Sequence, residues 1–318
     1  MKRIERWLFR KSPLAGLLLI MVIAGGCTTT KQYATLAEAG ANYTGAVAAL
    51  ADKASAIKAE TTSYRLLQER RNSIAKKHAW TAGDSLILAR RLGDADLSDS
   101  KALGDNRVSM KVARNLHDYF AALQAMAASS APADIGTKTG DLVKQLNATI
   151  AAAGGSATSD IPVNSAIVTT VMTRVTEAEL KKELTERRRT LVPALTMLDN
   201  IMAAVKSGMA KDLSKLKTQR YLRLVETPFA DGRTSLSGSI SDEDLWIRSR
   251  VKHYSGTDED AEVRNLVTAA ETSSAAFRKV FDKMTSNSGD GYSIDELDSA
   301  VSDINQFSGI VQSFSKGE

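Results

Sequence analysis

Apolar and small side chains recur three and four positions apart along the first long segment of the chain, and no proline interrupts them. The positions are Tyr33, Leu36, Gly40, Tyr43, Val47, Leu50, Ala54, Ile57, Thr61 and Tyr64. This heptad spacing predicts a helix that buries one stripe against its neighbours. Followed to His78 it is a rod of more than forty residues, on the order of 70 Å long. We expect a break near Gly83 rather than continuation, because glycine inside a helix costs about 1 kcal/mol.

The middle of the chain alternates between polar stretches and shorter helical patterns. The polar stretch from Gly93 to Asp105 predicts a loop, and so does the segment from Ser129 to Gly136. Each loop is followed by a helix with one apolar face. The faces consist of Val108, Val112, Leu116, Tyr119, Leu123 and Met126, and of Leu142, Leu146 and Ile150. The second of these helices ends at Gly154-Gly155-Ser156, which we interpret as a flexible linker between two subdomains.

A second long helical pattern runs from Asn164 to Glu226. Its core stripe consists of Leu191, Leu195, Leu198, Met202, Val205 and Met209. Pro193 lies inside it, and an interior proline removes one backbone hydrogen bond and clashes with the preceding turn. We therefore expect either a kink near Arg189 or two helices that meet there. The next loop is predicted from Thr227 to Arg233.

Three N-terminal capping signals open the helices of the last third of the chain. They are Ser241-Asp-Glu-Asp244, Thr257-Asp-Glu-Asp260 and the capping box Ser293-Ile-Asp-Glu296. The last two precede helical apolar stripes. The stripes are Val263, Leu266, Ala270, Phe277, Val280 and Met284, then Ile294, Leu297, Val301, Ile304, Phe307, Val311 and Phe314. Capping and periodicity therefore agree on where these helices begin.

Composition supports the same fold class. Aromatic residues make up only 5% of the chain, and alanine is abundant, which favours close helix packing over sheets. We predict an all-α fold, an elongated antiparallel helical bundle with long coiled-coil-like helices. It spans residues 33–318, with two subdomains divided near 153–162.

The N-terminus has the features of a secretory signal peptide. Five basic residues (Lys2, Arg3, Arg6, Arg10 and Lys11) precede an apolar run from Leu14 to about Ala24. That run is about eleven residues long, whereas a helix needs roughly 20 to cross a bilayer core. We therefore predict that residues 1–26 are a signal peptide and not a permanent membrane span.

The apolar run ends in Ile23-Ala24-Gly25-Gly26-Cys27, which resembles the lipobox of bacterial lipoproteins. Ala24 stands where that pattern usually has leucine. The resemblance covers residues 1–28 and implies cleavage after Gly26, acylation of Cys27 and a short tether at 27–32. In a bacterium with two membranes, Thr28 after the cysteine implies the outer membrane, with the protein facing the periplasm. The alternative is ordinary signal peptidase cleavage and an unmodified Cys27.

Removal of this segment changes the charge of the chain. The whole chain has a net charge of +5, but residues 1–26 hold five of its 42 basic and one of its 37 acidic residues. The remaining 37 basic and 36 acidic residues leave a formal net charge of +1. Nucleic acid is therefore not an expected partner.

Two segments have partial resemblance to the EF-hand calcium loop, which needs carboxylates at its first and twelfth positions and glycine at its sixth. With Gly291 at the sixth position, Asn287-Ser-Gly-Asp-Gly291 would place Ser286 first and Leu297 twelfth, so a capped turn is expected instead. The segment from Asp94 to Asp105 has oxygen ligands at suitable spacing but Asp99 at the sixth position. An acidic loop that caps the next helix is favoured there over a calcium site.

No other pattern indicates catalysis or metal binding. His78, His117 and His253 lie far apart in sequence, which favours surface or half-buried bundle positions. Cys27 is the single cysteine, so no internal disulfide is possible. No nucleophile elbow, P-loop, dinucleotide fingerprint or His-Glu-x-x-His motif is present. We therefore expect no catalytic residues, metal or cofactor.

A basic segment with interleaved acids occupies the second long helix. Lys181-Lys182 and Arg187-Arg188-Arg189 alternate with Glu177, Glu179, Glu183 and Glu186. Glu183 and Arg187 are spaced for an i, i+4 ion pair on an exposed helix. A solvated, salt-bridged face is expected, with contact to anionic lipid or cell-wall polymer as the alternative.

These features favour a non-enzymatic lipoprotein of the bacterial cell envelope, held at the membrane through Cys27. It would act as a scaffold or protein-interaction module, through a protein partner or through self-association of the helix that starts at Tyr33. The alternative function is a small-molecule or lipid-binding bundle, with space left by small residues such as Gly40 and Ala54. An exported hydrolase would need convergent carboxylates or a Ser/His pair that the sequence does not reveal.

Overall fold

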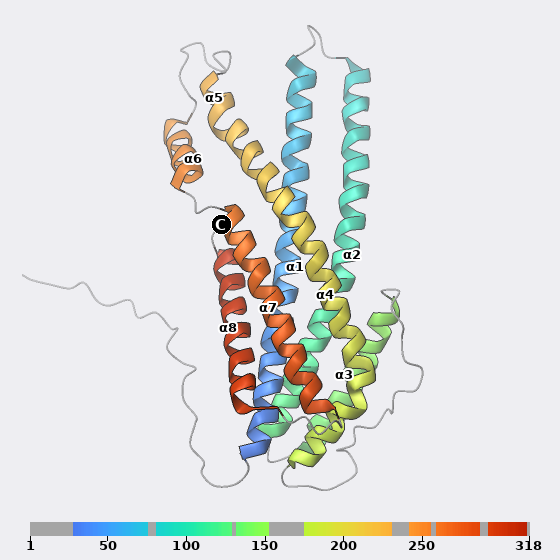
Figure 1. Ribbon diagram of the computed structural model, residues 1–318. Coiled ribbons are helices and arrows are strands. Elements are labelled where there is room, and N and C mark those ends of the chain that lie inside the picture. Colours follow the sequence, from blue (N-terminus) through green and yellow to red (C-terminus); the bar gives the residue numbers. More distant parts are fainter. Residues whose placement is uncertain are drawn as a thin grey trace, which may run out of the picture.

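The computed structural model describes residues 28–75, 81–128, 132–152, 175–230, 242–255, 259–286 and 292–316. These ranges contain helices and no strand, which confirms the all-α prediction for the part of the chain described (Figure 1). The α-helices are α1 (Thr28–Ala75), α2 (Ala82–Ala128), α3 (Pro132–Ala152), α4 (Glu177–Tyr221), α5 (Thr227–Ala230), α6 (Glu243–Ser255), α7 (Glu259–Thr285) and α8 (Ile294–Lys316). A π-helical segment, η1 (Leu222–Glu226), connects α4 to α5.

Helices α1 and α2 form a long antiparallel hairpin. Its register is visible in three contacts: Nδ1 of His117 is 2.8 Å from the carbonyl oxygen of Ala41, Asn106 donates to Oγ of Ser55 at 2.8 Å, and Thr62 donates to Oδ1 of Asp99 at 3.1 Å. Residue numbers rise along α1 while their partners fall along α2. The sum of the two residue numbers is nearly the same for each contact. The two helices therefore keep one register along the hairpin.

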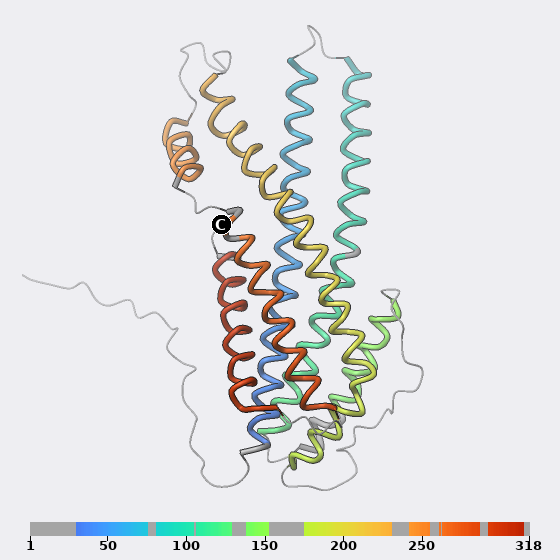
Figure 2. The backbone as a smooth tube through the Cα atoms, in the orientation of Figure 1, coloured from blue at the N-terminus to red at the C-terminus, as the bar shows by residue number. Residues whose placement is uncertain are grey.

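The other helices pack around the first half of α1. Helix α4 runs parallel to α1, as the contacts Thr61 with Asp212 and Tyr64 with Arg223 show. Helices α7 and α8 then cover α1 from another side (Figure 1). The backbone trace shows α1, α2 and α4 continuing well beyond the end of α8 (Figure 2). One half of the molecule is therefore a many-helix bundle, and the other half consists of the hairpin together with the end of α4, α5 and α6.

The heptad stripe of α1 is the core of this bundle. Tyr33, Leu36, Tyr43, Val47 and Leu50 are each at most 2% exposed. Because these side chains pack within the chain, self-association remains a proposal that needs another surface.

The face of small residues around Gly40 brings two helices into close contact. A Cβ atom built on Gly40 would lie 2.7 Å from Cγ of Phe120. The ring of Phe120 therefore fills the space beside Gly40 that the sequence suggested for a ligand.

Several predicted loops are helical, and tertiary contacts explain why. The stretch from Gly93 to Asp105 lies inside α2, so the predictions of a loop and of a capping role there are wrong. Ala95 from this stretch is buried and Asp99 accepts the hydrogen bond from Thr62, so packing against α1 outweighs weak helix propensity. A straight helix also separates the carboxylates that a calcium loop would bring together.

The second predicted loop is shorter than expected. The predicted loop from Ser129 to Gly136 is already helical from Pro132 onward, where proline fits the first turn. Thr227–Ala230, predicted as the start of a loop, is α5.

The second long helix begins later than predicted. Thr176 is its N-cap: the Thr176 hydroxyl accepts from the backbone N–H of Glu179, and the Glu179 carboxylate accepts from the backbone N–H of Thr176 at 2.8 Å. A helix that runs unbroken from Asn164 is therefore wrong. Pro193 lies inside α4 without dividing it into two helices. Leu191 and Ala194 beside it are fully buried, and this packing offsets the lost backbone bond.

Other predicted helix boundaries are confirmed. Ser293 and Glu296 form the expected capping box, with Glu296 N–H donating to Ser293 Oγ at 3.1 Å. Helix α6 is capped by Asp242, which accepts from the N–H of Leu245 at 2.7 Å, one residue later than predicted. The expected break near Gly83 exists, since α1 ends at Ala75 and α2 begins at Ala82. The cap at Thr257 and the linker at 153–162 lie outside the described residues.

Candidate functional site

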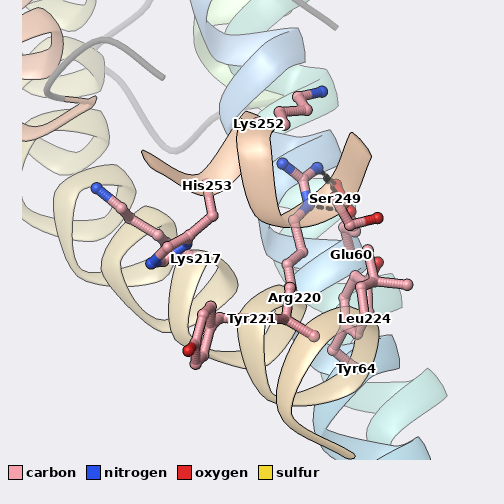
Figure 3. Close-up of a pocket in the computed structure, with 10 residues that line it drawn as sticks. Glu60, Tyr64, Lys217, Arg220, Tyr221, Leu224, Ser249, Lys252 and His253 are labelled. Atoms are coloured by element: carbon pink, nitrogen blue, oxygen red, sulfur yellow. Dashed lines mark hydrogen bonds and ion pairs between the residues drawn. The ribbon is translucent and has the colours of Figure 1, made fainter. Parts of the chain in front are cut away.

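A groove of about 270 Å³ lies where α1, α4, η1 and α6 meet (Figure 3). Its lining includes Glu60 and Tyr64 of α1, Lys217 and Arg220 of α4, and Lys252 and His253 of α6. The groove lies in the half of the molecule beyond α8, away from the start of α1 (Figure 1).

The local sequence explains why α4 changes its winding here. Pro228 has no N–H, so the α-helical bond to the carbonyl group of Leu224 cannot form. The backbone widens instead, and the N–H of Thr227 donates to the carbonyl oxygen of Leu222, five residues earlier. The hydroxyl of Thr227 donates to the same oxygen at 2.6 Å. Short π-helical segments of this kind are frequent at functional sites.

Helix α6 is attached to this widened turn. The indole Nε1 of Trp246 donates to the carbonyl oxygen of Val225 at 2.9 Å. Val225 itself is buried, so the bond ties α6 to a fixed part of the wall. The ring of His253 lies 4.5 Å from that of Tyr221, which makes a second contact between α6 and the end of α4.

Positive charge is in excess in the groove. Arg220 binds Glu60 in a bidentate ion pair, with Nη2 2.7 Å from each carboxylate oxygen. Glu60, the single acid of the lining, is thereby paired with Arg220. Lys217 and Lys252 form no ion pair with any residue that the structure describes, and they extend to different sides of the Arg220–Glu60 pair (Figure 3).

Two guanidinium groups on η1 and α6 lie over tyrosine rings. Arg223 lies 5.8 Å from the ring centre of Tyr64, and Arg250 lies 5.3 Å from that of Tyr254. A side-chain hydrogen bond with Tyr254 raises the pKa of Tyr221 above its usual value. Glu226 is the acid near Tyr221, and Arg250 is the cation near it.

The residues singled out from the sequence are not gathered in this groove, apart from His253. Cys27, His78 and the turn at 287–291 lie outside the described residues. His117 and His253 are half-buried, as predicted, and lie on α2 and α6. Within the described ranges, no three His, Cys, Asp or Glu side chains come together as metal ligands would.

The basic segment of α4 is only partly the solvated face that we expected. Glu183 and Arg187 are buried and form an ion pair of 3.1 Å, so the prediction of an exposed pair is wrong. Helix α4 contacts α1, α2, α3 and α7, which leaves this face no access to water. Burial and the nearby Glu183 carboxylate raise the pKa of Tyr119 well above its usual value.

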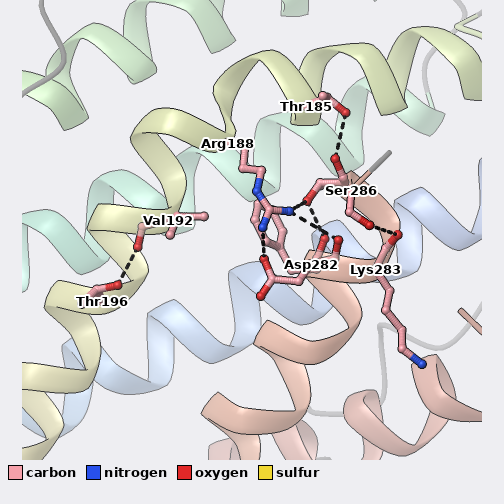
Figure 4. A network of polar contacts seen from close by, with 9 residues as sticks. Thr185, Arg188, Val192, Thr196, Asp282, Lys283 and Ser286 are labelled. Atoms are coloured by element: carbon pink, nitrogen blue, oxygen red, sulfur yellow. Dashed lines mark hydrogen bonds and ion pairs between the residues drawn. The ribbon is translucent and has the colours of Figure 1, made fainter. Parts of the chain in front are cut away.

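The neighbouring charges do reach the surface, where they hold α4 against α7 (Figure 4). Arg188 binds Asp282 at 2.7 Å and donates to the hydroxyl of Thr285 at 2.7 Å. Lys182 lies 3.9 Å from Glu186 on an exposed part of α4. The ion pair between Arg188 and Asp282 therefore stabilises the packing of α4 on α7.

None of the described helices has a stretch long and apolar enough to cross a bilayer. Comparison of the chain with known protein families, with curated proteins and with solved structures gives no significant match in any of the three.

Sequence reasoning missed the groove because it is assembled from distant segments. Glu60 and Arg220 are 160 residues apart, and neither lies in a motif. One local signal was available: Thr227-Pro228 at the end of a helical pattern indicates disturbed backbone bonding.

Proposed function

We propose that the protein is a non-enzymatic lipoprotein of the bacterial cell envelope, which acts as a scaffold or protein-interaction module. The observation that carries this proposal is that α1 begins at Thr28, directly after Cys27, and continues unbroken to Ala75. Residues 28–32 of the predicted tether belong to α1, so with Cys27 acylated no flexible tether would separate the anchor from the bundle. At about 1.5 Å per residue, the groove at Glu60 would lie about 50 Å along α1 from the membrane anchor.

The arrangement of surfaces supports this function. The end of the molecule next to the anchor is a packed bundle, whereas the groove and much exposed apolar surface lie at the other end. Exposed apolar residues there include Leu86, Ile87, Leu97, Phe229, Ile247, Val251 and Tyr254. A rod that holds such surfaces away from a membrane suits recognition of a partner protein. We place the protein at the outer membrane, facing the periplasm, on the basis of Thr28.

The alternative is a bundle that binds a lipid or small molecule in its core, which the small residues Gly40 and Ala54 suggested; at Gly40 the structure gives it no support. The small residue Gly40 contacts Phe120 and leaves no space.

The proposal is tested by the intact mass of the protein extracted from membranes, beside a Cys27→Ala variant. We expect cleavage before Cys27 and the added mass of acyl chains, both lost in the variant. Two or three acyl chains would hold the protein stably, where one would not. An unmodified Cys27 in the wild-type protein would contradict the anchor and with it the scaffold proposed here.

A further inference from the structure

We propose that the groove and the outer face of α6 bind an acidic amphipathic segment of a partner protein. This inference rests on the proposed function, because it names the partner chemistry of an interaction module. It draws on three observations: the two faces of α6, the charge around the groove, and the size and position of the hollow.

Helix α6 has two different apolar faces. Trp246 and His253 point toward η1 and α4 and attach the helix, as described above. Ile247 and Val251 lie one helical turn apart on another face and are 50% and 57% exposed. Tyr254, which is 65% exposed, follows at helical spacing and also contacts Tyr221 of α4, with 6.4 Å between the ring centres. A short helix that was attached only for stability would need one apolar face. The second face, with its large exposed side chains, is typical of a recognition surface.

The charges beside this face select the partner. Arg248, Arg250 and Lys252 are exposed on α6, and Lys217 adds a further cation across the groove. The acids lie at the N-terminal end of α6: Asp242 caps the helix, and Glu243 and Asp244 occupy its first turn. The rest of the surface therefore combines apolar side chains with positive charge. Its complement is a segment that presents carboxylates beside apolar side chains.

The geometry favours a peptide over a compact anion or a membrane. Lys217 and Lys252 extend to different sides of the Arg220–Glu60 pair (Figure 3), an arrangement that suits a segment with several carboxylates along its length. A volume of about 270 Å³ suits one or two side chains of a docked segment, since pockets for whole small molecules usually start at about 300 Å³. A flat lipid surface would leave the hollow unfilled. Tyrosine and arginine, which surround it, are enriched where interfaces bind most strongly.

The test uses the full chain, extracted in mild detergent, and a fluorescein-labelled peptide of about twelve residues with glutamates on one helical face and leucine and tryptophan on the other. Fluorescence anisotropy should show saturable binding that weakens as salt is raised. The double variant Lys217→Glu/Lys252→Glu should weaken it by about tenfold or more. Val251→Asp should weaken it by about tenfold as well, because it breaks the apolar stripe.

The matched control is Lys211→Glu/Lys215→Glu, which makes the same change of charge at exposed positions of α4 outside the groove lining. Binding to this control should stay within about twofold of the wild type. Equal loss in both double variants would overturn the proposal, since net charge alone would then explain binding. No binding of the peptide, or binding that Val251→Asp leaves unchanged, would overturn it too.

Competing ligands are tested in the same assay. Inorganic phosphate or phosphatidylglycerol vesicles that bind while the peptide does not would replace the peptide with a compact anion or a lipid surface. Peptide binding in detergent does not depend on acylation, so its failure would leave the membrane anchor standing. Loss of the anchor in the mass measurement would conversely leave the peptide result intact.

Discussion

At the scale of single residues, Gly40 determines how closely α1 and α2 approach. Any side chain there would collide with the base of the Phe120 ring, which is fully buried beside Tyr119 and Phe277. Gly40→Ala should lower the free energy of unfolding by about 1–3 kcal/mol, through overpacking. This effect opposes the gain of about 1 kcal/mol expected from helix propensity. Urea denaturation of the two proteins measures the difference.

Gly309 provides the matched control for that experiment. It lies inside α8, with nothing within 4 Å of the position of an added Cβ. Gly309→Ala should therefore stabilise the protein by up to about 1 kcal/mol. Stabilisation by both substitutions would contradict the close contact at Gly40.

The buried pair of Glu183 and Arg187 leads to a second prediction. Replacing only Arg187 by methionine should destabilise the protein by about 3–5 kcal/mol, because the Glu183 carboxylate would stay buried without its cation. Replacing both, as Glu183→Leu/Arg187→Met, should restore most of the stability, since apolar side chains suit the site. Thermal unfolding of both variants and of the wild type tests this. A double variant as unstable as the single one would show that the pair itself stabilises the fold.

The spacing of these two residues predicted their contact but not their burial. An i, i+4 pair forms equally well on an exposed and on a covered helix. Whether water reaches it depends on how many other helices surround α4, which the sequence of α4 does not contain.

At the scale of elements, Glu296 joins the start of α8 to the end of α7. Its carboxylate binds Lys283 at 2.8 Å and Lys279 at 3.0 Å, and also closes the capping box with Ser293. These contacts, that with Lys283 foremost, lower the pKa of Glu296 from 4.5 to about 2. The charged form is favoured in the folded state, so its stabilising effect is present above pH 4.5 and is lost as the pH falls toward 2.

Glu296→Gln should therefore remove part of the acid sensitivity of the protein. Between pH 4.5 and about 2, the unfolding free energy of the variant should change less steeply than that of the wild type. Urea denaturation at several pH values in this range measures both slopes. Asp295→Asn, which removes an exposed neighbouring carboxylate, serves as the control and should keep the wild-type slope. If the unfolding free energies of Glu296→Gln and of the wild type changed with pH at the same slope, the role assigned to the Glu296 contacts would be refuted.

Helix boundaries were predictable where a local signal exists and unpredictable where packing decides. The sequence predicts the capping box at Ser293. The same pattern occurs at Thr176 and Glu179, where no helix start was predicted. The polar stretch from Gly93 to Asp105 carries no helical signal of its own. It is helical because α1 lies beside it, and no local pattern reveals that neighbour.

At the scale of the whole molecule, the buried apolar residues of the α1–α2 hairpin are concentrated in one half of its length. Ile57 is the last buried apolar residue of α1, and Ala95 is the first of α2 among the described residues. The outer part of the hairpin is held mainly by polar contacts, such as Arg91 with Glu69 at 3.7 Å. Such regions open locally at lower free energy than the core.

Hydrogen exchange followed by mass spectrometry should show this division. Amides at 63–75 and 82–94 should exchange much faster than those at 36–57 and 110–126, although all of them lie in helices. Local opening would explain the difference, because fewer buried contacts are lost there. Equal exchange rates for all amides of α1 would contradict this division.

The all-α fold and the long first helix could be predicted because they follow from periodicity alone. The groove could not, because Glu60, Lys217 and Lys252 come from three helices whose contacts depend on tertiary packing. Nothing in the spacing of these residues indicates that they meet.

The constant pairing of α1 with α2 has a consequence for how such a chain can change. Because each residue of one arm faces a fixed counterpart in the other, equal lengths could be removed from both arms beyond Tyr64, which contacts Arg223 of η1, and before Ala95. A deletion of two helical turns, about seven residues, from each arm keeps the heptad phase. The hairpin would become about 10 Å shorter, while the buried core kept its contacts. Paired insertions and deletions could therefore change the length of this hairpin without changing how the bundle folds.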